Sequence, residues 1–286
     1  MQHLKEYIAQ AEAAKHAIGH FNISNLEGFW AVVNAIKTLH VPVIIGISEG
    51  ERDFVGLFEI VTLVKFVREK YELPLFVNAD HTYSYERVVE AIDAGCDSVI
   101  IDGAALSLEE NIALTKRCVA YARQKGSVTL IEGEVGYIGQ SSKVLDAIPE
   151  GVDTALASSP EEVARFVTET GVDLLAPSVG NFHGMLRSGG ELLHLDIIAG
   201  IRAAAGVPLV LHGGSGISHT EFVQAIDAGI SVIHISTELR VAYRSGLTQA
   251  LTENPDEIAP YKYLRGARDA MQKAIEEKLK VFNKIP

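Results

Sequence analysis

The chain has 286 residues, of which 48% are hydrophobic and 22% charged, and its formal net charge is −12. This composition excludes a disordered chain, because it supplies enough apolar side chains for a large core. The negative charge argues against nucleic acid as a partner, and two cysteines, Cys96 and Cys118, are too few for a disulfide framework. The chain begins like an amphipathic helix, and no apolar run approaches the roughly 18 residues of a membrane span. We therefore expect a cytoplasmic protein with no membrane partner.

Short apolar segments recur along the chain and predict buried parallel strands. In chain order, the eight segments are Ala17–Phe21, Val43–Ser48, Leu75–Ala79, Ser98–Ile101, Ser127–Ile131, Val172–Ala176, Pro208–Leu211 and Val232–Ile235. Amphipathic stretches between them predict helices, the clearest being Glu86–Ala94, Glu109–Lys125, Pro160–Thr170 and His219–Ala228. Helix-capping residues such as Ser84 and Ser159 precede two of these stretches.

The strict alternation of strand and helix indicates a parallel sheet, and eight strands are the number that closes a (β/α)8 TIM barrel. No linker divides the chain, so we expect one barrel domain over residues 1–286, with a C-terminal helical extension at about 255–286. Residues 136–154 form the longest stretch without periodicity. A loop of this length in a compact barrel is usually functional or mobile.

Polar residues follow the predicted strands, where barrel enzymes place their active sites. His81, His183 and His212 follow three different strands, which suits a catalytic zinc ion with one open position. Asp80, beside His81, is a candidate acid/base. Each histidine taken alone is more commonly a structural loop residue, but three beside carboxylates favour a metal site. His20 follows the first strand and its role stays undecided.

Glycines after the seventh strand predict an anion site. Gly213, Gly214 and Ser215 precede a helix whose amides and dipole favour phosphate, and Ser236 and Thr237 at the next strand end add hydroxyls and amides. The alternative is a tight turn that merely needs glycine. Either Arg187 or Arg240 could supply a cation, or each could be a solvated surface residue. We also place Asn22, Ser48, Gly184 and His234 in the substrate-binding group, because each lies at a strand end.

The motifs together resemble the class II, metal-dependent fructose- and tagatose-bisphosphate aldolases over essentially the whole chain. The similar segments, in order, are GHFNISNLE, PVIIGISEG, NADHTYSYE, SVIIDGA, EGEVGYIG, GNFHG, LHGGSGI and APYKYLRGARDAM. None of these segments alone is specific for the family, but all of them together, in this order and at this spacing, are.

The resemblance implies a role for each matching position. His81, His183 and His212 would bind catalytic Zn²⁺, Asp80 would exchange a proton with the C4 hydroxyl, and Asp102 and Glu134 would lie at a second-cation position. Gly184, Gly213, Ser215, Ser236 and Thr237 would hold dihydroxyacetone phosphate with help from a monovalent cation, Na⁺ or K⁺, and Arg240 would reach a far phosphate. The implied reaction is cleavage or formation of a ketose (bis)phosphate, in which zinc stabilises the enediolate. We expect a homodimer or homotetramer acting on a small-molecule sugar phosphate in carbohydrate metabolism such as glycolysis.

Several positions depart from the family pattern and leave the sugar open. His234 stands where the family has Asn, and Ser236 where it often has Asp or Ala. Ser142 and Lys143 replace a Glu-Asp pair, so Asp146 or Glu150 would have to move the second proton unless that step differs. Thr82 replaces a Gly. The alternatives are therefore an aldolase for another ketose phosphate and a non-catalytic partner subunit. The retained Asp80 and histidines argue against the second alternative.

Overall fold

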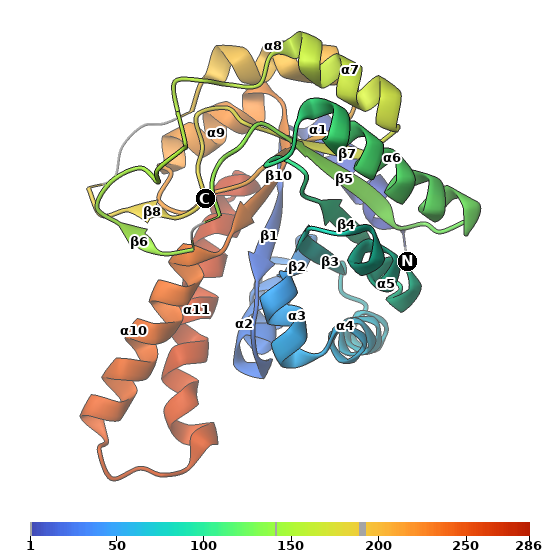
Figure 1. Cartoon of the computed structure of the whole chain (residues 1–286). Coiled ribbons are helices and arrows are strands. Elements are labelled where there is room, and N and C mark those ends of the chain that lie inside the picture. The colour runs from blue at the N-terminus through green and yellow to red at the C-terminus, as the bar shows by residue number, and fades with distance from the viewer. Residues whose placement is uncertain (1, 141, 189–192) are drawn as a thin grey trace.

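The chain folds into a closed barrel of eight parallel strands surrounded by helices (Figure 1), which confirms the predicted (β/α)8 architecture. The computed structural model describes residues 2–140, 142–188 and 193–286. Around the barrel the strand order is β1-β10-β9-β7-β5-β4-β3-β2. The barrel strands are β1 Ile18–Asn22, β2 Val43–Ile47, β3 Leu75–Thr82, β4 Ser98–Ile101, β5 Leu130–Val135, β7 Leu174–Pro177, β9 Leu209–Leu211 and β10 Ile230–Ile235.

Helix α1 precedes the first strand, and the other helices follow strands or one another and lie around the barrel (Figure 1). They are α1 Leu4–Ala14, α2 Leu26–Leu39, α3 Glu49–Val55, α4 Leu57–Tyr71, α5 Tyr85–Ala94, α6 Leu108–Gln124, α7 Pro160–Thr170, α8 Leu195–Ala205, α9 His219–Ala228, α10 Thr237–Glu253 and α11 Pro260–Phe282. Among the described residues, no helix has both the length and the apolar character that crossing a membrane requires.

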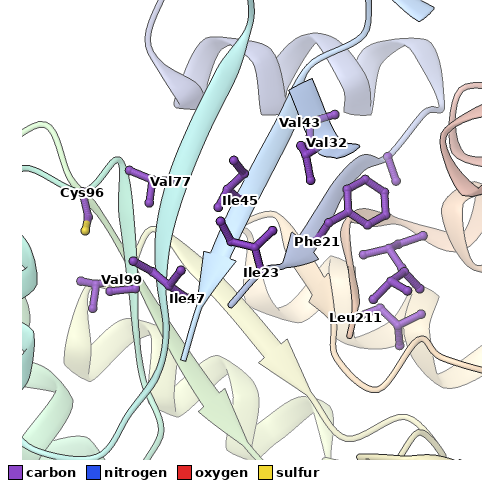
Figure 2. Close-up of a cluster of buried hydrophobic side chains, with 14 of the residues drawn as sticks. Phe21, Ile23, Val32, Val43, Ile45, Ile47, Val77, Cys96, Val99 and Leu211 are labelled. Carbon is purple, nitrogen blue, oxygen red and sulfur yellow. The ribbon is translucent and has the colours of Figure 1, made fainter. Parts of the chain in front are cut away.

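The outward faces of the strands and the inner faces of the helices form the main core. Phe21, Ile45, Val77 and Val99 come from four neighbouring strands and are fully buried. Figure 2 shows these side chains together, with Val32 of α2 packed beside them. Both faces of each strand are thus covered, which explains why the strands are nearly continuous apolar runs in the sequence.

The inside of the barrel has an apolar end and a polar end, because alternate residues of a strand face the same side. At the amino-terminal end, Ile18, Ile44, Phe76 and other inward-facing residues form a cluster that Leu4 and Ile8 of α1 cover. Two residues further along the strands, the inward-facing positions become polar. They include His20, Asn78, Glu132, His212 and His234, all at most 5% exposed. Helix α1 therefore closes one end, and the polar residues lie toward the other.

The third and fifth strands continue beyond their predicted ends, into residues that are polar. The fifth strand was expected at Ser127–Ile131 but runs over Leu130–Val135. It begins later than expected because Thr129 lies in a turn before the strand, where its amide donates to the Ser127 side chain and its hydroxyl donates to the Cys96 carbonyl. Glu132 and Glu134 consequently lie within the strand rather than after it. The same correction applies to Asp80 and His81, which belong to β3.

The long loop expected at residues 136–154 contains one short strand. Strand β6, Val144–Leu145, pairs in parallel with β8, Met185–Leu186, in the loop that follows β7. The His183 amide donates to the Ile138 carbonyl at 2.9 Å. The two loops thus support each other at the open end of the barrel.

The predicted C-terminal helical extension is α11, which lies beside α10 as an antiparallel hairpin (Figure 1) and also packs against α2. The two helices approach closely at Gly246 and Gly266. A Cβ atom on Gly246 would lie 2.4 Å from the Gly266 carbonyl oxygen and 2.7 Å from the Ala270 Cβ. Glycine at this crossing is therefore a packing requirement.

Replacing Gly246 with Ala should lower the free energy of unfolding by about 1–3 kcal/mol, because the added methyl group overpacks the crossing. Gly200 in α8 is the matched control, since its Cβ would meet only the Pro160 Cγ at 3.9 Å. Gly200→Ala should instead stabilise the protein by up to about 1 kcal/mol through helix propensity. Urea unfolding of both variants measures the difference. Equal stabilisation by the two substitutions would contradict the close helix contact.

Candidate metal centre and active site

An irregularity in β3 turns two consecutive side chains into the barrel. The pairing of β3 with β4 shifts between Ala79 and Thr82, so that β3 has one extra residue there. His81 has a positive φ of 34°, which L residues rarely adopt. In a regular strand, Asp80 and His81 would face opposite sides, but this bulge lets both side chains reach the same centre.

Three histidines meet at this centre, as the sequence predicted. The Nε2 atom of His81 lies 3.2 Å from the Nδ1 atom of His212, close to the roughly 3.3 Å that separates two nitrogens bound to one tetrahedral zinc. The ring of His183 lies 4.6 Å from that of His81, and its buried Nε2 has no hydrogen-bond partner among the described residues. One nitrogen from each ring lies within 4.8 Å of the other two. This donor set fits a zinc ion.

The loops that carry His183 and His212 contact each other through a side chain of one loop and the backbone of both. The Asn181 side chain donates to the His212 carbonyl at 2.9 Å. Gly213 has a φ of 63°, and a Cβ atom there would lie 2.2 Å from the Phe182 carbonyl oxygen. Only glycine permits this approach, and it brings two of the three histidines side by side.

Carboxylates orient two of the histidine rings. Asp102 lies 2.9 Å from the Nδ1 atom of His81, and Glu132 lies 2.8 Å from the Nε2 atom of His212. Each contact leaves the other ring nitrogen facing the centre, the arrangement typical of metal-binding histidines. Glu134 lies deeper, with Oε2 3.9 Å from the Nδ1 atoms of both His81 and His212 and without a hydrogen-bond partner in the described part of the chain.

The electrostatics of the centre favour a bound cation. Burial lowers the pKa of His183 and His212 well below the usual range, which keeps both rings neutral and able to bind metal. Burial also lowers the pKa of His81, but the charge of Asp80 and the hydrogen bond to Asp102 outweigh it and raise that pKa to about 10. Burial, with Asp102 nearby, raises the pKa of Glu134 well above its usual value. Positive charge is thus stabilised at His81.

Asp80 is a buried carboxylate that is nevertheless ionised. Burial raises its pKa, but the positive charge on His81 and the contact with His234 outweigh this and hold the pKa well below the usual range. Asn22 donates to Asp80 Oδ2 at 2.9 Å, while Oδ1 lies 3.4 Å from His234 Nδ1. Asp80 Oδ1 is also 3.9 Å from His81 Nε2. The carboxylate is therefore fixed beside the histidine centre and can accept a proton there.

His20 and His234 form a stack that continues onto His212. The rings of His20 and His234 are 3.4 Å apart and nearly parallel, and the His234 ring is 4.1 Å from that of His212. The His20 ring lies against β2 at Gly46, where a Cβ atom would be 2.0 Å from it. Burial lowers the pKa of His20 to about 3. His20, undecided from sequence, is thus a neutral ring that fills the barrel beneath His234.

A cleft opens beside the centre and collects most of the predicted site residues. Its lining includes Asn22, Ser48, Asp80, His81, His183, Gly184, Gly213, Ser215, His234, Ser236, Thr237 and Arg240. Gly214 does not line it, because its amide donates to the His234 carbonyl and its Cα faces β10. Asp102 and Glu134 lie behind the histidines. Asp146 of the long loop is exposed and paired with Arg187 at 3.1 Å.

One end of this cleft can hold an anion. Helix α10 begins there at Thr237, and its N-cap residue Ser236 makes no side-chain capping hydrogen bond. The Ser215 hydroxyl accepts from the Glu238 amide at 3.1 Å, which joins the loop after β9 to this helix end. The hydroxyls of Ser215, Ser236 and Thr237 and the dipole of α10 together favour a phosphate group.

Sequence reasoning missed Glu51 and Arg52, which support the cleft from α3. Glu51 accepts hydrogen bonds from the amide of Ser48, the side chain of Asn22 and the guanidinium of Arg240, the last at 2.6 Å. Arg52 is fully buried and donates to the Thr82 hydroxyl at 3.0 Å. The signal was present, because Ser48 and Glu51 have the S-x-x-E spacing of a capping box and place Glu51 in the first helical turn.

Comparisons with known proteins agree with this geometry. Residues 2–285 match the family model described as fructose-bisphosphate aldolase class-II. The chain is 36% identical to the fructose-bisphosphate aldolase of Geobacillus stearothermophilus and 35% identical to that of Staphylococcus aureus, with 98% of this chain and 96% of each relative covered. The crystal structure of the YdjI aldolase from Escherichia coli K12 superposes with a TM-score of 0.80 at 30% identity, covering 98% of this chain and 96% of that one. The chain therefore belongs to the class II fructose-bisphosphate aldolase family, whose members are lyases.

Proposed function

We propose that the protein is a zinc-dependent aldolase that cleaves a ketose phosphate into dihydroxyacetone phosphate and an aldehyde, and catalyses the reverse condensation. The observation that carries the proposal is the meeting of three histidines with an ionised, buried Asp80 beside an anion-binding helix end. A metal centre, a proton acceptor and a phosphate site are the three groups that this reaction needs.

His81, His183 and His212 would hold the zinc ion, which when bound supplies a Lewis acid that stabilises negative charge on the ketose oxygens. Asp102 and Glu132 keep two of the rings in the binding orientation through their hydrogen bonds. Asp102 and Glu134 are also proposed for a second-cation position, supported by their closeness to His81.

Asp80 would accept the proton of the C4 hydroxyl while the C3–C4 bond breaks, and would return it in the condensation. Asn22 holds the carboxylate by donating to Oδ2, so the oxygen facing the cleft keeps a fixed position. Asp80 is 3% exposed and lines the cleft, so a substrate bound there would meet the carboxylate directly and could exchange a proton with it.

The phosphate of the dihydroxyacetone phosphate half would lie at Gly213, Ser215, Ser236 and Thr237, with Gly184 close by. A monovalent cation, Na⁺ or K⁺, is proposed to assist there. The cytoplasmic location, the glycolytic role and the homodimeric or homotetrameric assembly stay predictions.

The overall proposal is tested by measuring zinc content together with dihydroxyacetone phosphate release from a panel of ketose phosphates. About one zinc ion per chain and release from at least one sugar support it. A metal-free protein that releases nothing from any sugar after zinc is added would contradict it, and would favour a non-catalytic partner subunit.

Substituting any of the three histidines tests the metal centre. His212→Ala should lose both zinc and activity, because two histidines alone leave the centre too weakly bound. His219→Ala is the matched control, since His219 is exposed at the start of α9 and should change neither property. Elemental analysis and the release assay measure the two effects. Stoichiometric zinc and full activity in His212→Ala would refute the assignment.

Asp80→Asn should retain zinc and lower kcat by about 10²–10⁴-fold, because the amide cannot accept the proton. Asp102→Asn should behave differently. It weakens the orientation of His81 and should reduce zinc affinity by about 10–100-fold, with kcat largely restored at saturating zinc. Zinc titration followed by steady-state kinetics separates the two patterns. Loss of zinc in Asp80→Asn would instead make Asp80 a ligand.

His234 should influence which ketose is cleaved, since its ring lines the cleft beside Asp80 and has a rigid stacked position. Asn is smaller and can donate and accept hydrogen bonds at once. His234→Asn should therefore change the ratio of kcat/KM between fructose and tagatose phosphates, which differ at C4. Ser236→Ala provides the comparison for a neighbouring cleft residue. An unchanged ratio in His234→Asn would show that His234 does not select the substrate.

A further inference from the structure

A second cavity continues outward from the cleft and would receive the aldehyde half of the substrate. This outer pocket shares Ser48, His81, Ser142, His183 and Arg240 with the cleft, and adds Glu49, Gly50, Tyr83 and Gln140. The phosphate cradle at Ser215 and Thr237 lies only in the inner cleft. A ketose anchored by its first phosphate would thus extend its other end past the histidines into the outer pocket.

The two arginines at the outer pocket are already paired with carboxylates. Arg240 pairs with Glu51 at 2.6 Å, and that carboxylate is buried and also binds Ser48 and Asn22. Glu49 lies in the pocket wall, 3.9 Å from the buried guanidinium of Arg52. Two arginines therefore face two carboxylates. A phosphate dianion entering this pocket would find both arginines already paired with carboxylates and would approach Glu49 directly.

Arg240 is also the single Lys or Arg side chain that lines either cavity within residues 2–140, 142–188 and 193–286. Lys143, next to Ser142, is exposed and does not line them. One paired arginine between two pockets cannot neutralise two phosphate groups. Apart from His81, His183 and Gly50, the remaining lining of the outer pocket carries hydroxyl, amide and carboxylate groups, which form hydrogen bonds with sugar hydroxyls.

We propose that the preferred substrate is a ketose phosphorylated only at C1, whose far end carries free hydroxyl groups. This inference rests on the proposed function and deepens it. In cleavage, the C4 hydroxyl gives its proton to Asp80 as the C3–C4 bond breaks. C3 then takes up one proton from water and Asp80 releases the proton that it accepted, so that no net proton is consumed and the products are dihydroxyacetone phosphate and an unphosphorylated hydroxyaldehyde.

The experiment compares kcat/KM of the zinc-loaded protein for fructose 1-phosphate and tagatose 1-phosphate with the values for the two 1,6-bisphosphates. We expect the better monophosphate to exceed both bisphosphates by at least about tenfold, because the second phosphate meets like charge. A preference for either bisphosphate would overturn the inference while leaving the aldolase proposal intact. If no sugar in the panel is cleaved, the proposed function itself fails.

A charge substitution tests the cause. Glu51→Gln removes one carboxylate charge and leaves Arg240 unneutralised, so kcat/KM for a 1,6-bisphosphate should rise relative to its 1-phosphate, and the gain should shrink at high salt. Glu49→Gln should act in the same direction without touching Asn22. Glu59→Gln, at an exposed position of α4, is the control with the same change in net charge. An unchanged ratio in both pocket variants would contradict the charge argument.

A preference for bisphosphates in the unmodified protein that disappears in Lys143→Ala would also overturn the inference, and would identify the loop lysine as the missing cation.

Discussion

Charged and polar side chains can lie inside this barrel only because they satisfy one another. Isolated, each buried imidazole or carboxylate would cost several kcal/mol in lost hydration. Here Asp102 and Glu132 contact histidines, Asn22 holds Asp80, and Asn78 donates to Ser98 at 2.7 Å. Within the described residues, the buried side-chain nitrogens and oxygens without a hydrogen-bond partner lie on His20, Arg52, Asn78, Asp80, Glu134, His183 and His234, and most of these residues lie in or beside the same centre. The polar end of the barrel is therefore a network that is satisfied around its edges and stays open at the histidine centre.

This network depends on deviations from regular backbone geometry. The extra residue in β3 and the positive φ of His81 are local costs of about 1–3 kcal/mol that the surrounding packing must offset. Gly46 also contributes to the network, because its lack of a side chain leaves room for the His20 ring that stacks on His234. The apolar cluster under α1 and the core around Phe21 supply that stabilisation without entering the site.

The architecture and the three histidines could be predicted from sequence, whereas the exact strand limits and the charge network could not. Apolar runs identify strands only while both faces are apolar, so Glu132 and Asp80 were placed beyond strands that in fact include them. Glu51 and Arg52 follow the second strand on a helix, and their pairing with Arg240 and Glu49 joins segments distant in sequence. Likewise, the stacking of His20 on His234 comes from the closure of β1 against β10, which no local pattern encodes.

Helix α1 closes the amino-terminal end of the barrel with Leu4 and Ile8, and this makes the interior a chamber with one opening. A metal ion, a substrate and its products would all have to pass through the same mouth. On the proposed function, a sugar bound in the cleft would stand between the ion and solvent, so turnover and metal exchange would compete for one path. Under saturating substrate, a chelator in solution would then reach the ion only in the intervals between catalytic cycles. Retention of the metal would thus become a kinetic property as well as an equilibrium property of the histidines.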